Sequence, residues 1–167
     1  TANSYAGNTV ISGNTTGVLA LGVADQIPNG AGKGNVVVTA GTLKLNGFNE
    51  TINGLSGAGI VDGGSGTPTL TVGDNNATST FAGVITDTAG TLSLTKTGSG
   101  YLMLNGVNTY SGTTLVNAGT LGGSGTIGGP VSVAANAELA PGSATGTVGK
   151  LTLGGTLALN DADLTYD

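Results

Sequence analysis

The chain has 167 residues, of which only 8% are charged, and its net charge of −5 includes four basic residues that are all lysine. Phosphate recognition needs clusters of basic side chains, so this balance excludes a nucleic-acid-binding protein. Cys and His are absent, which excludes a nucleophilic triad built on either residue. No run of 18 apolar residues exists to cross a membrane, and the 38% hydrophobic content indicates a folded chain rather than a disordered one.

The first feature along the chain is the segment 3–13, NSYAGNTVISG, because its pattern returns at 108–121 as NTYSGTTLVNAGTL. The two copies share Asn, Tyr, Gly and Thr at the same spacing. The matched pairs are Asn3 and Asn108, Tyr5 and Tyr110, Gly7 and Gly112, and Thr9 and Thr114. Internal repetition of this kind is typical of a solenoid, in which each turn meets similar neighbours above and below.

Short strands are predicted wherever two aliphatic residues are separated by one residue and followed by a turn. Alternation places both aliphatics on one face of a strand and a residue such as Lys44, Thr71, Ser93 or Thr152 on the other. No helical periodicity is present, so the sequence predicts an all-β protein. The pairs, in chain order, are Leu43/Leu45, Leu70/Val72, Leu92/Leu94, Leu102/Leu104, Leu151/Leu153 and Leu157/Leu159.

Corners between strands are predicted at three copies of Ala-Gly-Thr-Leu, at 40–43, 89–92 and 118–121. In two of them a strand would end at Val38 or Val116, and the next would open at Thr-Leu. The glycines of the three copies, Gly41, Gly90 and Gly119, would supply the positive φ or the close backbone approach that a corner needs. The copies are unequally spaced, which suits a coil of short strands joined by turns of varying length.

Two architectures fit these elements. In an antiparallel sandwich, Leu-Asn-Gly at 45–47 and 104–106 would form hairpin turns, and the strands would have unrelated sequences. In a parallel β-helix the same short motifs should recur from coil to coil. Recurrence favours the β-helix, with roughly seven coils at the usual coil length.

The segment 94–121 resembles the autotransporter-associated β-strand repeat, also called the passenger-associated transport repeat, of bacterial passenger domains. That pattern consists of Lys, Gly-x-Gly, Leu-x-Leu-x-Gly, Asn-x-Tyr-x-Gly-x-Thr and a closing Gly-Thr-Leu. The matching residues are Lys96, Gly98, Gly100, Leu102, Leu104, Gly106, Asn108, Tyr110, Gly112, Thr114, Gly119, Thr120 and Leu121.

The resemblance covers nearly the whole chain and implies one right-handed parallel β-helix domain over 1–167. The segment 138–159, within 130–167, is similar to the part where such arrays approach their end, and the first copy starts partway through the motif. We therefore expect a piece of a longer array or a processed subunit, exported and exposed on, or released from, a bacterial surface. The family offers no active site to carry over, so Asn3, Asn108, Tyr5 and Tyr110 are interpreted as structural.

Asp62 and Asp87 are candidates for a functional site because the two carboxylates could lie on adjacent turns. Such a pair could perform acid/base chemistry on a glycan or hold Ca²⁺. Both lie in turn-like contexts, where Asp commonly bonds its own backbone, and this interpretation is favoured. Asp161 and Asp163 are read as solvated surface. Threonine pairs (69/71, 78/80 and 95/97) are similar to ice-binding faces, but their unequal spacing predicts no ordered array.

The sequence thus predicts a non-enzymatic structural module with no catalytic residue, metal site or cofactor and with no identifiable ligand-binding residues. The module would be a rigid stalk, spacer or fibre subunit whose partner is a second copy, end to end or lateral, or another surface repeat. One alternative is an adhesin that binds host or matrix glycans or receptors through a β-helix face. A less favoured one is a polysaccharide-cleaving β-helix.

Overall fold

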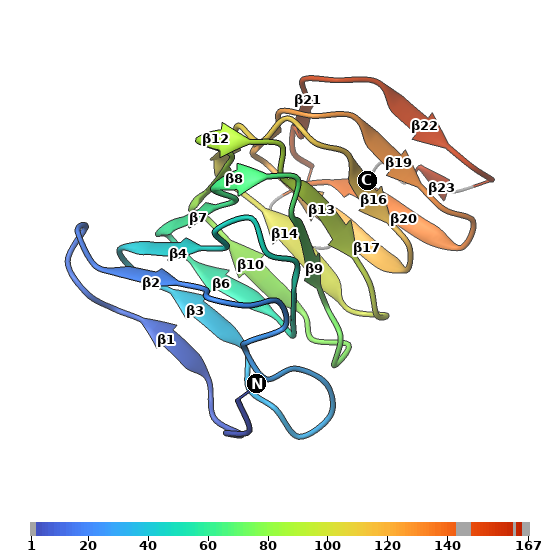
Figure 1. Cartoon of the computed structure of the whole chain (residues 1–167). Coiled ribbons are helices and arrows are strands. Elements are labelled where there is room, and N and C mark those ends of the chain that lie inside the picture. The colour runs from blue at the N-terminus through green and yellow to red at the C-terminus, as the bar shows by residue number, and fades with distance from the viewer. Residues whose placement is uncertain (1–2, 143–147, 162, 165–167) are drawn as a thin grey trace.

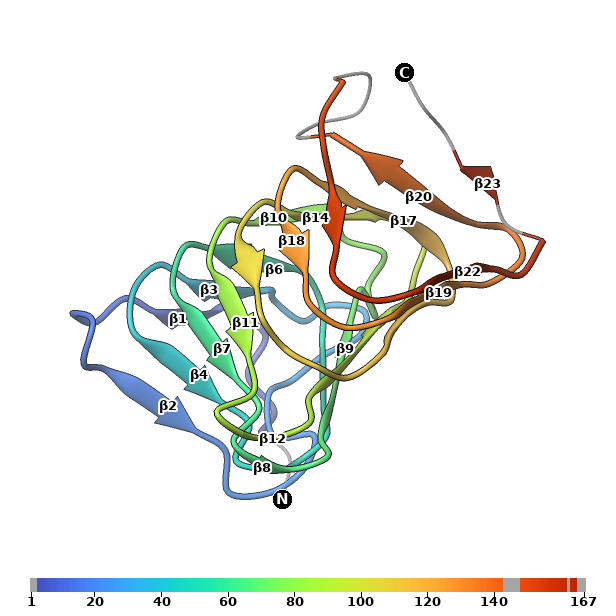
Figure 2. The ribbon, with the colours of Figure 1, turned by 90° about the horizontal axis from the view of Figure 1, so that it is seen from above.

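The computed structural model describes residues 3–142, 148–161 and 163–164, and in these segments the chain consists of short strands joined by turns (Figure 1). Seen from above, successive turns follow a three-sided path and stack along one axis (Figure 2). No helix in the described part of the chain has the length and apolar character needed to cross a membrane.

The first side of the solenoid, side A, is an eight-stranded parallel sheet. Its strands, in order, are β1 (Thr9–Ile11), β3 (Val36–Val38), β6 (Leu55–Gly57), β10 (Ser79–Phe81), β14 (Tyr101–Leu104), β17 (Gly119–Gly123), β20 (Ala137–Pro141) and β23 (Asp163–Leu164).

The second side, side B, consists of a four-stranded sheet that is continued by a three-stranded one. The first contains β2 (Val18–Ala20), β4 (Thr42–Lys44), β7 (Ile60–Asp62) and β11 (Val84–Thr86), and the second contains β15 (Val107–Asn108), β18 (Thr126–Ile127) and β21 (Thr152–Leu153).

The third side, side C, is a six-stranded parallel sheet. It contains β5 (Glu50–Ile52), β9 (Thr69–Val72), β13 (Ser93–Lys96), β16 (Thr114–Val116), β19 (Val131–Val133) and β22 (Leu157–Leu159). Between sides B and C, the short strands β8 (Ser65–Gly66) and β12 (Ala89–Gly90) pair with each other.

This arrangement confirms the predicted all-β parallel solenoid. Six turns, from β3 to β22, contribute a strand to every side. The pairings between strands are parallel, so the hairpins of the sandwich alternative do not form. Leu-Asn-Gly at 45–47 and 104–106 instead lies at corners between sides. The right-handed sense of the coil stays a prediction.

The core lies inside the three sides and is filled by the predicted aliphatic pairs. Leu43, Leu45, Leu102 and Leu104 are fully buried, as are Leu70, Leu92 and Leu94. The pair Leu157/Leu159 in β22 differs, since these side chains are 39% and 41% exposed. Parallel register stacks like on like, so each turn buries its aliphatics against those of the next turn, which supplies most of the driving force for folding.

The corners use glycine as predicted. Gly41 and Gly119 have φ values of 78° and 65°, a region in which other residues are strained. Gly90 is needed because there is no room for a side chain: a Cβ would clash with the carbonyl oxygen of Gly66 on the preceding turn. The corner between sides A and B carries a column of such positions, formed by Gly59, Gly83, Gly106 and Gly125.

Candidate functional site

The repeated Asn-x-Tyr-x-Gly-x-Thr segments form the same local structure twice. The Tyr110 hydroxyl lies 2.6 Å from Thr114 Oγ1, and the Tyr5 hydroxyl lies 2.6 Å from Thr9 Oγ1. Tyr110 is fully buried, whereas Tyr5 is 42% exposed. Burial raises the pKa of Tyr110 despite its hydrogen bond to Thr114, so this phenol stays neutral and serves packing rather than acid/base chemistry.

The repeat asparagine joins three successive turns. Asn108 Oδ1 accepts a 2.9 Å hydrogen bond from the backbone N–H of Ile85, and its Nδ2 donates to the carbonyl of Thr126 at 2.9 Å. In the first copy, Asn3 Nδ2 donates to the carbonyl of Gln26 at 3.0 Å. These asparagines therefore replace ladder hydrogen bonds between turns, which confirms their structural interpretation.

Lys96, identified in the sequence only as a motif residue, is a buried ammonium inside the aliphatic core. Its position in β13 is aligned with Val72 on one side and Val116 on the other. Nζ donates to the carbonyls of Thr97, Gly98 and Ala118 at 2.6, 2.7 and 3.1 Å. Burial lowers the lysine pKa to about 8. The strand alternation that places Leu94 inward also places Lys96 inward, and this was the signal available in the sequence.

A second buried polar cluster holds the segment 26–34 against β5. The Glu50 carboxylate is 1% exposed and accepts hydrogen bonds from the backbone N–H groups of Gln26 and Ile27 at 2.9 and 2.8 Å. Burial raises the pKa of Glu50, more than those two bonds lower it. Asn53 completes the cluster by donating from Nδ2 to the carbonyls of Gly30, Lys33 and Gly34. Sequence reasoning missed both residues.

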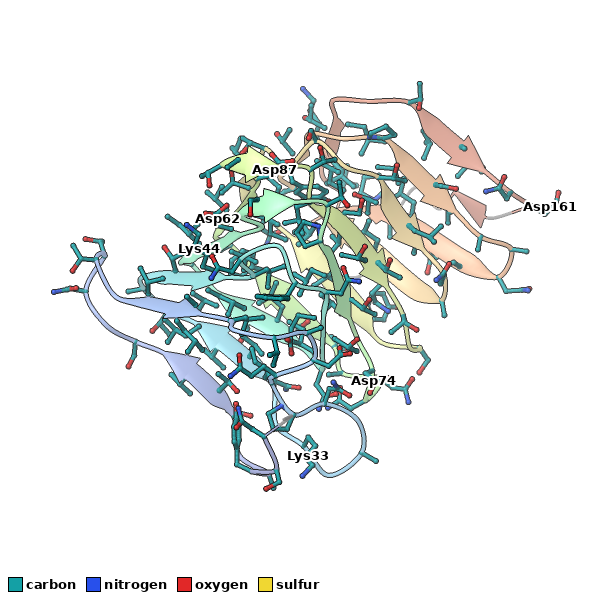
Figure 3. The ribbon with its side chains drawn as sticks, viewed as in Figure 1. Lys33, Lys44, Asp62, Asp74, Asp87 and Asp161 are labelled. Atoms are coloured by element: carbon teal, nitrogen blue, oxygen red, sulfur yellow. The ribbon has the colours of Figure 1, made fainter. Side chains whose placement is uncertain are left out.

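The structure places Asp62 and Asp87 on adjacent turns, as proposed, but each binds its own partners. Asp62 Oδ1 accepts from the backbone of Gly64 and from the backbone and hydroxyl of Thr88, and its Oδ2 lies 4.0 Å from Lys44 Nζ (Figure 3). Burial alone would raise the pKa of Asp62. These hydrogen bonds and Lys44 together lower it by more, so the net pKa is below the ordinary value. The carboxylate is thus ionised and serves the corner.

Asp87 has the same role one turn further along. Its Oδ2 accepts from the backbone N–H of Leu92 at 3.2 Å and from the backbone and hydroxyl of Ser111 at 2.8 and 2.6 Å. A shared catalytic geometry for the two aspartates is not present, since their acceptor atoms are directed to different segments. Asp161 is exposed, and Asp163 lies in β23 next to Glu138. The described residues contain no cluster of His, Cys, Asp or Glu suited to a metal ion.

The threonine pairs are divided between two sides. Thr78 and Thr80 lie in or before β10 on side A, whereas Thr69 and Thr71 lie on side C and pair with Ser93 and Thr95. Thr51 pairs with Thr71 as well. The three predicted pairs therefore do not stack on one another, as expected, although single threonines from different turns, Thr51, Thr71 and Thr95, align on side C.

Fold and site together define a parallel β-solenoid whose conspicuous polar residues bond one turn to the next. Comparison with known proteins agrees: residues 94–122 match the family described as passenger-associated-transport-repeat, so the chain contains this repeat. The chain is also similar to the "Adhesin BmaC autotransporter" of Brucella suis biovar 1 (strain 1330), with 33% identity over 121 residues. That similarity covers 70% of this chain and 3% of the relative. No solved structure matches the chain.

Proposed function

We propose that this chain is a non-enzymatic, rigid segment of an exported bacterial passenger, which acts as a stalk or spacer outside the cell. The observation that carries this proposal is the use of the repeat residues. Lys96, Asn108 and Tyr110 have their polar groups directed to neighbouring turns or to their own turn, and Asp87, which precedes the repeat, binds the next turn as well. A chain whose polar groups in the repeat bond one turn to the next is suited to transmitting force and holding distance.

The partner that we propose for the module is a second copy of itself, bound end to end or laterally. Strands β1 and β2 carry exposed apolar side chains, with Val10 at 55%, Val18 at 59% and Leu19 at 38% exposure. Exposed apolar side chains on a protein surface favour association with another protein surface, and we propose a second copy as that surface.

Electron cryomicroscopy at rising protein concentration tests both statements. We expect rods of uniform width whose length grows by stacking. Round or flexible particles would contradict the stalk, and rods that stay at the length of one chain would contradict self-association alone. A polysaccharide-cleaving activity that disappears in Asp62→Asn or Asp87→Asn would overturn the non-enzymatic assignment.

A second candidate function, adhesion, is favoured by one observation: the similar Brucella protein is named as an adhesin. In that case the module would bind a host or matrix component through one of its sides.

A further inference from the structure

Side C carries an ordered set of hydroxyl side chains on three adjacent strands, which we name the hydroxyl face. Its members occupy the outward positions of β5, β9 and β13 and are all half-buried. Register aligns Thr51, Thr71 and Thr95 in one column and Thr69 with Ser93 in a second. The hydroxyl face consists of Thr51, Thr69, Thr71, Ser93 and Thr95.

The hydroxyls of this face are free to bind an external molecule. In the part of the chain that the structure describes, none of these five side-chain oxygens makes a hydrogen bond. Several threonines elsewhere have bonded hydroxyls: those of Thr88, Thr109 and Thr120 contact Asp62, Thr86 and Glu138. Side C thus gathers, among the described residues, five hydroxyls without such bonds in two aligned columns.

The charge of the face points to an uncharged ligand. The two charged residues of these strands, Glu50 and Lys96, are directed inward and are buried. The whole chain has a net charge of −5. An anionic polymer would thus find no cation on this face and would be repelled by the molecule as a whole.

The spacing of the face points to an extended polymer. Columns on a parallel sheet repeat at about 4.8 Å from strand to strand, and alternate residues along a strand lie about 6.6 Å apart. The sugar units of an extended β-linked polysaccharide repeat at an interval close to the strand spacing and present hydroxyls at their edges and C–H groups on their faces. Threonine can contact both kinds of group: its hydroxyl can bond a sugar hydroxyl, and its methyl group can pack on a C–H face. Its β-branched side chain is also stiff.

We propose that the hydroxyl face binds an uncharged, extended, β-linked polysaccharide lying along the solenoid axis, with one sugar unit per turn. The proposal rests on the extracellular role proposed above and gives it a ligand class.

The test is adsorption of the protein to microcrystalline cellulose and to chitin, compared with the double variant Thr71→Val/Thr95→Val. Valine keeps the shape and removes the hydroxyl, so we expect the wild type to adsorb and the affinity of the variant to fall about tenfold. The matched control is Thr42→Val/Thr126→Val, which makes the same changes on side B and should leave adsorption unchanged.

Thermal unfolding by circular dichroism checks that the variants are folded, and electron cryomicroscopy of the same samples tests the stalk separately. Equal adsorption by both double variants would overturn the proposal, as would a wild type that adsorbs to neither polysaccharide while still forming rods. Adsorption to ice but to neither polysaccharide would also overturn it, because the face would then be matched to an ordered water layer.

Discussion

At the scale of single residues, the buried lysine is the feature that links the stability of the fold to pH. Lys96 is stacked between two valines, its three N–H donors are matched by three carbonyl acceptors, and among the described residues it has no acidic partner. Three matched hydrogen bonds favour the ammonium form, while desolvation opposes it. At pH 7 the ammonium form is retained, because the lowered pKa of about 8 is still above that pH.

Lys96 predicts that the protein becomes more stable as the solution becomes moderately alkaline. Its folded pKa of about 8 is below the ordinary value of 10.5, so between these values the unfolded chain binds more protons than the folded one. The free energy of unfolding should therefore rise by about 2–3 kcal/mol from pH 8 to pH 10. Above this range the raised pKa of Tyr110 acts in the opposite direction, since the phenol ionises only in the unfolded chain.

Urea unfolding at several pH values checks this expectation. The rise should be absent in Lys96→Met and present in Lys150→Met, which changes an exposed lysine. The same rise in Lys96→Met would show that another group is responsible.

The two tyrosines of the repeat provide a comparison within one chain. Tyr110→Phe removes a buried hydroxyl and leaves the Thr114 side chain without its 2.6 Å partner, so we expect a loss of about 1–2 kcal/mol of unfolding free energy. Tyr5→Phe removes the same bond where the ring is 42% exposed, and water can replace it, so the change should stay within about 0.5 kcal/mol. Denaturant unfolding of both variants measures the difference, and equal losses would refute the role of burial.

Residue roles were predictable from the sequence only where a residue type has one common use. Asn108 and Tyr110 were read as structural, and Asp62 as a turn residue that bonds nearby backbone; the structure confirms these interpretations. Glu50 was missed because a carboxylate in a strand is ordinarily exposed, and its burial depends on two amides brought to it from the preceding turn.

At the scale of elements, the strands were predictable and their alignment was not. Alternating pairs such as Leu102 and Leu104 identify a strand and its inward face, because period-two burial is local. The alignment of Thr51, Thr71 and Thr95 depends instead on how many residues each corner absorbs. Corner length is set by contacts with the neighbouring turns, and these contacts are not visible in a single segment.

The glycine column at the corner between sides A and B predicts a strong effect of one methyl group. In Gly106→Ala the new Cβ would lie 1.8 Å from the carbonyl oxygen of Gly83, a backbone atom that cannot turn away. We expect a loss of about 3 kcal/mol, at the upper end of overpacking effects. Gly22→Ala is the control, since nothing lies within 4 Å of its added Cβ. Thermal unfolding compares the two, and an unchanged midpoint in Gly106→Ala would disprove this packing.

At the scale of the whole molecule, stability should be distributed along the axis, because each turn contacts mainly its two neighbours. The segment 26–34 covers the β5 edge of side C through Glu50 and Asn53. In Glu50→Ala the amides of Gln26 and Ile27 lose their acceptor, so their hydrogen exchange should accelerate at least tenfold, about 1.4 kcal/mol of local opening. The amides of β13 and β16 serve as an internal reference and should not change; acceleration there would indicate global unfolding instead.

The corners that absorb unequal numbers of residues have a consequence for the reach of the protein. Each turn advances the chain by one strand spacing, about 4.8 Å, however many residues its corners contain. The length of the solenoid is therefore set by its number of turns. Residues inserted at a corner widen one turn and leave that length unchanged. Two solenoids with the same number of residues can consequently differ in length along their axes.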